Sequence, residues 1–111
     1  MYLQVKNKTI LYLLKNLITK LNVKAEYVDL QNIGGQPQDI TGWTLRSERG
    51  NQDCTLSGII EPGETLRVWA RQADVGRGGF NCGYAENIWN NNETDPAVLF
   101  DTQMLEIDRK Q

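Results

Sequence analysis

The amino-acid sequence predicts an all-β fold, because alternating side chains recur between segments rich in turn-forming residues. In the stretch 26–45, apolar Val28 and Leu30 alternate with polar residues, which is the period of a strand with one face in a core. Glycine and proline residues then interrupt the run before a second alternating run begins. The same alternation over 65–70 predicts another strand of this kind.

The alternation also predicts which side chains form the core. Along 65–70, Arg67 and Trp69 fall on the opposite, outer face of the strand. The nine side chains expected to be buried between two sheets are Val28, Leu30, Trp43, Leu45, Leu66, Val68, Ala97, Leu99 and Ile107.

Turn signals separate the other predicted strands. In the turn 61–64, proline sets φ at the first central position and glycine accepts a positive φ at the next. The polar run 47–53 is predicted as a hairpin loop. The glycine-rich stretch 72–86 is predicted as the longest irregular segment, anchored by Phe80 and Tyr84 against the sheets. The short strands predicted around these turns are 54–56, 87–89, 97–100 and 105–107.

Four segments, in order, carry a resemblance to a known family. They read EYVDLQN with a glycine-rich turn and DITGWTLRS, then EPGETLRVWA, then NIWNNNETDPAVLFD, and finally MLEIDRK. In this order and spacing, residues 26–110 resemble the lamin tail domain, in the form of a bacterial stand-alone or accessory module. The resemblance implies an immunoglobulin-like β-sandwich of the lamin tail domain type. It also implies a structural or interaction role, as at the tail of nuclear intermediate-filament proteins, and brings no catalytic residues.

The N-terminal segment admits two interpretations. Apolar residues from Ile10 to Leu21 lie at helical spacing with lysines on the other side, which is typical of an amphipathic helix. Against the helix, the segment lacks a capping box at its start and a glycine stop at its end. The resemblance implies instead a first strand over 9–14 and a loop over 15–24. We adopt the strand and keep a helix over 10–21 as the alternative.

Length and composition are those of one folded domain. The chain has 111 residues, and we expect a single domain over 1–111. A hydrophobic content of 40% with 23% charged residues excludes a disordered chain and a membrane-embedded one. The longest apolar run, 10–14, is too short for a bilayer span or a signal peptide. The chain as given is therefore expected in the cytoplasm, or outside the cell if a leader was removed.

The net charge of −2 divides unevenly along the chain. Residues 1–25 carry five lysines and no acid, whereas residues 26–111 carry seven basic and fourteen acidic residues. An acidic body repels the phosphate backbone, which argues against broad nucleic-acid binding. The basic segment is expected to lie on the chain's own acidic surface. In the alternative, it reaches an anionic partner or membrane.

The residue types exclude most catalytic chemistry. The chain has no histidine, which removes the usual general base, the usual metal ligand and every nucleophile–histidine pair. Two cysteines without histidine cannot supply the four ligands of a structural zinc site. Neighbouring acids are expected to be solvated surface groups, namely Asp29 with Glu26 and Asp39, and Asp95 with Glu93. No phosphate-binding glycine loop occurs. We therefore predict no catalytic residue, no cofactor, no metal site and no small-molecule substrate.

The two cysteines are Cys54 and Cys82. A disulfide between them would require an oxidising compartment. Cys54 lies in a strand-like run and Cys82 in a predicted loop, and this placement favours two free thiols while leaving the disulfide open.

The expected function is that of a non-catalytic module that binds a protein partner through a sheet face and loops. The expected contact residues are of types common at binding hot spots, namely Arg67, Trp69, Arg71, Arg77 and Phe80. The alternative is an accessory binder of nucleic acid or an anionic membrane surface through the lysines of the N-terminal segment. Exposed edge strands leave both a monomer and a homodimer open.

Overall fold

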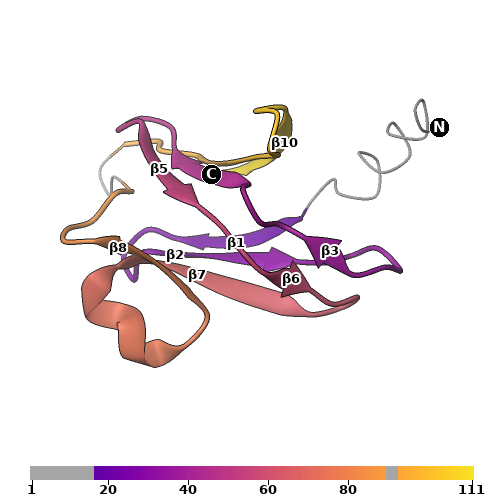
Figure 1. Ribbon diagram of the computed structural model, residues 1–111. Helices are drawn as coiled ribbons and strands as arrows, with labels where there is room; N and C mark the ends of the chain where they lie inside the picture. Colours follow the sequence, from indigo (N-terminus) through magenta and orange to yellow (C-terminus); the bar gives the residue numbers. More distant parts are fainter. Residues whose placement is uncertain (1–16, 90–92) are drawn as a thin grey trace.

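Two four-stranded sheets face each other in a sandwich, and a small two-stranded sheet lies at one end (Figure 1). This computed structural model describes residues 17–89 and 93–111. The first sheet has the order β1-β2-β7-β8 and contains β1 (Ile18–Asn22), β2 (Tyr27–Gln31), β7 (Thr65–Arg71) and β8 (Phe80–Tyr84). The second has the order β10-β9-β4-β5 and contains β4 (Thr44–Ser47), β5 (Gln52–Thr55), β9 (Ala97–Phe100) and β10 (Glu106–Lys110). The small sheet pairs β3 (Gln38–Asp39) with β6 (Ile59–Ile60), and the 3-10 helix η1 (Gln72–Arg77) joins β7 to β8. The predicted all-β sandwich is confirmed.

The core lies between the inner faces of the two large sheets. Val28 and Leu30 are fully buried on β2, and Leu45 of β4 lies opposite Leu99 of β9. Of the nine predicted core residues, eight are buried, and Leu66 is partly buried against the same cluster. The largest fully buried apolar side chains that the prediction missed are Leu17, Ile40, Leu56, Ile60 and Trp89. They lie outside strands or in a two-residue strand, where no alternation marks them.

The first described strand corrects the prediction for the N-terminal segment. Strand β1 lies within the predicted loop 15–24, and the helix alternative is wrong over 18–21, while 9–14 lies outside the described residues. The cause is a register shift between Ile18 and Lys20. The shift places Ile18 and Leu21, three residues apart, against the core. A β-bulge therefore produced the spacing that resembled a helix.

The predicted irregular stretch 72–86 contains a second correction, because its last part is strand β8. This strand runs parallel to β7 and directs Phe80, Cys82 and Tyr84 toward the core. Cys82 forms a disulfide with Cys54 of β5, so the expectation of two free thiols is wrong. Because residues 80–84 form a strand beside β7, Cys82 lies at the edge of the first sheet, where it meets Cys54 of β5. The strand predicted over 87–89 is absent, and that segment is irregular.

The edge strands of the two large sheets face each other in two seams. At one seam the disulfide joins β5 to β8, and the Tyr84 hydroxyl donates to the Asp53 carbonyl of β5. At the other seam, the Ile18 amide of β1 donates to Asp108 Oδ2 of β10 at 2.9 Å. A carboxylate turned toward an edge in this way is a common protection against strand addition. The outer faces of the sheets are therefore the broader surfaces open to a partner.

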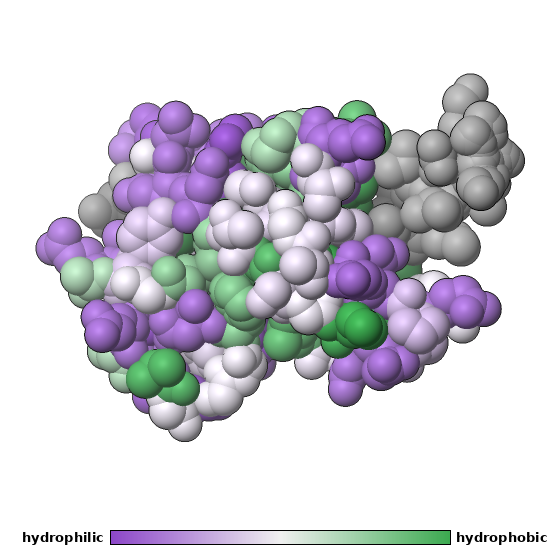
Figure 2. All heavy atoms as spheres, viewed as in Figure 1, coloured by the Kyte–Doolittle hydropathy of each residue, from purple (hydrophilic) through white to green (hydrophobic). Residues whose placement is uncertain are grey.

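The face that carries β5 and β6 shows how side chains are distributed on the surface. In Figure 2, weakly polar and hydrophobic residues fill its middle, and hydrophilic residues gather along its borders. The strongly hydrophobic side chains near its rim are separate from one another, so no single apolar patch covers this face. Within 17–89 and 93–111, no helix has the length and apolar character needed to cross a bilayer.

Candidate functional site

The outer face of the first sheet carries an aromatic pair. Tyr27 of β2 and Trp69 of β7 lie directly opposite each other in the antiparallel register. Their ring centroids are 5.0 Å apart, with the planes at 61° in an edge-to-face arrangement. Cross-strand neighbours on one face touch in this way, so the pair forms an apolar base for the residues above it.

Three cations cover this aromatic base. The guanidinium carbon of Arg67 lies 3.9 Å from the Tyr27 ring centroid and 5.7 Å from that of Trp69. Arg77 lies 5.3 Å from the Trp69 centroid, and Lys20 Nζ lies 5.7 Å from the Tyr27 centroid. These distances are those of cation–π contacts. Under these side chains, Trp69 is only 5% exposed.

Two carboxylates hold the arginines from below. Arg67 donates from Nε and Nη2 to the two oxygens of Asp29, at 2.8 and 3.0 Å, and these hydrogen bonds raise the pKa of Arg67. Asp74 of η1 accepts from Arg71 Nε at 3.2 Å, and its other oxygen lies 3.1 Å from Arg77 Nε. The bidentate geometry fixes the plane of the Arg67 guanidinium. We call the set Lys20, Tyr27, Asp29, Arg67, Trp69, Arg71, Asp74 and Arg77 the cationic face.

The second sheet carries a similar contact of an arginine with a carboxylate and an aromatic ring, but there the carboxylate is more exposed than the arginine. Arg46 of β4 pairs with Asp53 of β5 at 2.6 Å and lies 4.8 Å from the Phe100 ring centroid. Here the carboxylate is the more exposed partner, at 44% against 27% for the arginine side chain. On the cationic face, the Arg67 side chain is 43% exposed and that of Asp29 only 11%. In these two ion pairs, the arginine is therefore the more exposed partner on the first sheet and the aspartate on the second.

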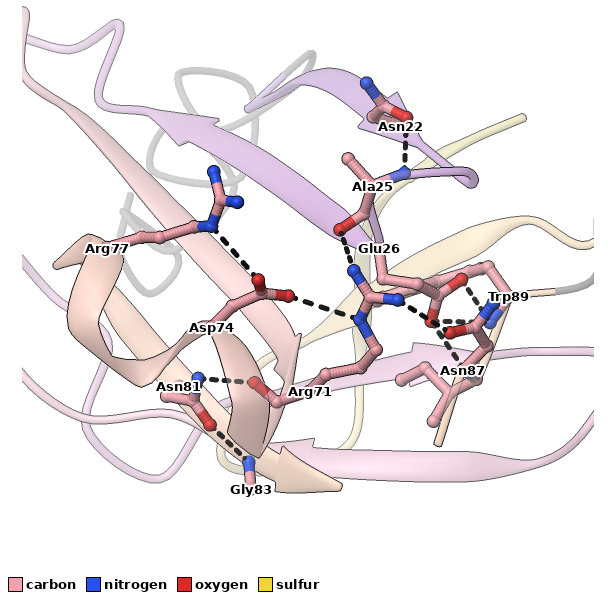
Figure 3. Close-up of polar contacts among 11 residues, drawn as sticks. Asn22, Ala25, Glu26, Arg71, Asp74, Arg77, Asn81, Gly83, Asn87 and Trp89 are labelled. Carbon is pink, nitrogen blue, oxygen red and sulfur yellow. Dashed lines mark hydrogen bonds and ion pairs between the residues drawn. The ribbon is translucent and has the colours of Figure 1, made fainter. Parts of the chain in front are cut away.

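Arg71 ties the cationic face to the end of the sandwich (Figure 3). Besides its contact with Asp74, it donates from Nη1 to Asn87 Oδ1 at 3.2 Å and from Nη2 to the Ala25 carbonyl at 3.4 Å. The backbone carbonyl of Arg71 accepts from Asn81 Nδ2 of β8 at 2.8 Å. One arginine thus connects the β1–β2 turn, η1, β8 and the segment before Trp89.

A buried carboxylate lies beside this arginine. Glu26, Asp29 and Asp95 are all buried, so the expectation that these acids are solvated surface groups is wrong. The Glu26 side chain has no exposed surface and accepts from the backbone amides of Ile88, at 2.6 Å, and Trp89, at 3.2 Å (Figure 3). Burial raises the pKa of Glu26 from its usual value, and the two amide donors and nearby Arg71 partly offset this effect. Glu26 therefore anchors the irregular segment 85–89 to the β1–β2 turn.

The raised pKa of Glu26 predicts a pH dependence of stability. The folded state binds this proton more tightly than the unfolded chain does, so the unfolding free energy falls as the pH rises from about 4.5 through the raised pKa. The variant Glu26→Gln has no titrating group at this position, and the other titrating groups are common to both proteins. Urea melts at a series of pH values measure the unfolding free energy of both proteins. We expect the difference, wild type minus variant, to decrease as the pH rises from about 4.5 through the raised pKa of Glu26. A difference that is the same at every pH would contradict the assignment.

A glycine allows the chain to approach the cationic face closely. Gly79 has φ +67°, and a Cβ at this position would lie 2.2 Å from the backbone carbonyl oxygen of Arg67. A side chain cannot fit there without moving the strand that carries Arg67. The parallel return of β8 beside β7 therefore depends on glycine at this position.

The structure places the five predicted contact residues differently. Arg67 and Arg77 lie on the cationic face, with side chains 43% and 66% exposed. Trp69 is on the outer face as predicted, but it lies under the arginines, and Arg71 is half-buried in the network described above. Phe80 packs against the core on the inner face, so it is not part of this surface.

Several members of the cationic face were not predicted from the sequence. Tyr27 and Asp29 join it only through the pairing of β2 with β7, which is not visible in the local pattern. The contact of Asp74 with the two arginines could have been predicted, because Asp74 lies three residues after Arg71 and three before Arg77. On a 3-10 helix, residues at this spacing eclipse each other.

Other groups in the described part of the chain offer no chemical site. No cluster of three or more acidic or cysteine side chains in 17–89 and 93–111 has the arrangement to hold a metal ion. An open depression near the C-terminus includes two arginines, but both are in ion pairs, Arg109 with Glu48 and Arg49 with Glu93. The residues that line it are Glu48, Arg49, Thr94, Pro96, Arg109 and Gln111.

The two facing four-stranded sheets define the chain as a β-sandwich. The family model of the Lamin Tail Domain matches residues 15–111, and the chain belongs to this family. This confirms the resemblance to the family and extends it toward the N-terminus over residues 15–25, which include β1. The family is structural and not known for enzymatic activity, and it suggests a non-catalytic protein-interaction module. The comparison with curated proteins gives no match.

Proposed function

We propose that this domain is a non-catalytic module that binds a protein partner through the cationic face of its first sheet. The observation that carries the proposal is the pair of arginines held in place on an aromatic base. Arg67 has contacts with two rings and a bidentate carboxylate, and Arg77 has one ring and one carboxylate.

Such fixation favours binding. An arginine that is already ordered loses little side-chain entropy when a partner arrives, and association otherwise costs roughly 0.5–1.5 kcal/mol per immobilised side chain. Arginine, tyrosine and tryptophan are also the residue types most enriched at binding hot spots. Loops that follow η1 and the β1–β2 turn border the face, which agrees with a contact through both sheet and loops.

The proposal predicts which substitutions abolish capture of a partner from the native extract. The double variant Arg67→Ala/Arg77→Ala is expected to lose a protein that the wild type retains, since it removes both exposed guanidinium groups. The matched control is Arg46→Ala, which removes the arginine of the equivalent carboxylate–aromatic contact on the other sheet. Retention by the double variant, or loss with the control alone, would contradict the proposal. Cooperative melts of all three proteins verify that they are folded.

A further inference from the structure

We propose that the partner segment is acidic and extended, and that its carboxylates are bound by Arg67 and Arg77; this inference rests on the proposed function. Three observations support this assignment: the order in which charges are layered, the net charge of the sheet compared with the rest of the described chain, and the contact of both guanidinium groups with one ring.

The layering places cations outside and anions inside. Asp29 and Asp74, the acids of the cationic face, have side chains that are 11% and 9% exposed. The arginines above them are 43% and 66% exposed. The carboxylates therefore orient the guanidinium groups but are themselves covered, and a ligand approaching from solvent meets the cations first. On the second sheet, where Asp53 is the more exposed partner of Arg46, this layering is reversed.

The first sheet is also positive within an acidic domain. Strands β1, β2, β7 and β8 together with η1 carry four basic and two acidic residues, a net charge of +2. The rest of the described chain carries five basic and twelve acidic residues, a net charge of −7. Complementary charge of this kind steers a partner to one face and sets its orientation.

The distances on the face fit one extended segment. The guanidinium carbons of Arg67 and Arg77 lie 5.7 and 5.3 Å from the same Trp69 ring centroid. Alternate side chains of an extended chain are about 7 Å apart and point to the same side. The two guanidinium carbons are therefore no more than about 11 Å apart, and two acids at positions i and i+2 of a partner fall within this range. Guanidinium groups are suited to this task because their planar donors match the two oxygens of a carboxylate.

The surroundings favour a short acidic segment of a protein over a long polyanion. Double-stranded DNA carries about one charge per 1.7 Å of its axis, and an anionic membrane extends beyond any single domain. Either one would also meet the rest of the described chain, whose net charge of −7 would repel it. A short peptide segment contacts the sheet alone.

A peptide titration tests the inference. The probe is a short synthetic peptide with glutamate at every second position, and its control has glutamine at those positions. We expect the glutamate peptide to shift backbone amide resonances of β2, β7 and η1, with binding that weakens as salt is added. Arg67→Ala/Arg77→Ala should bind at least about tenfold more weakly, because both charge-assisted contacts are removed. Arg46→Ala should bind like the wild type.

The substitution Arg67→Ala leaves Asp29 without its ion-pair partner, so the double variant could fail to fold. In that case the single variant Arg77→Ala, at the more exposed position, replaces it in the titration. Equal binding of the glutamate and glutamine peptides, or shifts confined to the second sheet, would overturn the inference. Tighter binding to a DNA duplex or to phosphatidylserine vesicles, lost in the same variants, would assign the face to another class of partner and also overturn it. A third result separates the two proposals. If capture of a protein requires Arg67 and Arg77 but the glutamate peptide does not compete with that protein, the proposed function stands and only the inference of an acidic segment is wrong.

Discussion

The variant Trp89→Ala is expected to lose on the order of 3–5 kcal/mol of unfolding free energy, the usual cost of removing a large core aromatic. Trp89 is the largest of the fully buried side chains, at 1% exposure, although it lies in no strand. A domain of this size has a total stability of roughly 5–15 kcal/mol, so the loss is a large part of it. Chemical denaturation of the variant and the wild type measures the difference.

The matched control for this prediction is Trp89→Phe. The indole Nε1 of Trp89 is buried without a hydrogen-bond partner among the described residues, so replacement by phenylalanine removes no hydrogen bond to any of them. Phenylalanine keeps most of the apolar volume, and the expected cost is under about 1.5 kcal/mol. If both variants unfold at the midpoint of the wild type, the burial of Trp89 is contradicted.

Removal of the disulfide is the second large effect. The Cys54–Cys82 bond closes a loop with a sequence separation of 28 residues, and the loop-closure relation gives about 3.5 kcal/mol for this length. The variant Cys54→Ala/Cys82→Ala should therefore unfold at a clearly lower denaturant concentration. It should also lose the covalent connection between β5 and β8, which leaves the Tyr84–Asp53 hydrogen bond at that seam.

A reducing agent supplies the control for the disulfide prediction. Treatment of the wild type should lower its midpoint toward that of the double variant, and treatment of the variant should change nothing. A wild type that unfolds at the same midpoint with and without the reducing agent would be incompatible with a stabilising bond at this position.

The sequence predicted the strands whose side chains alternate, and it failed where the chain departs from that period. Strands β2, β7 and β9 are confirmed because one face of each is buried and the other is polar or covered. Strand β1 was misassigned because its bulge gives Ile18 and Leu21 a helix-like spacing. Strand β8 was read as a loop because its glycines indicated flexibility, whereas Gly79 is required by the close approach to Arg67.

The candidate site was predictable only in part, for a related reason. Residue type identified Arg67, Arg71 and Arg77, since arginine beside an aromatic residue is common in contact surfaces. The burial of Trp69 depends on the register that brings Tyr27 opposite it and on η1, which places Arg77 above it. The inward direction of Phe80 depends on the parallel pairing of β8. Long-range pairing of this kind leaves no mark in a local pattern.

The footprint of the captured partner on this domain is the most direct test of the central claim. The partner is the protein that the wild type captures and Arg67→Ala/Arg77→Ala does not. Amide hydrogen exchange of the domain is measured with and without this partner. The account predicts protection in β2, β7 and η1, with β4, β9 and β10 unchanged. Protection confined to the second sheet or to the β5–β8 seam, with the cationic face unaffected, would contradict it.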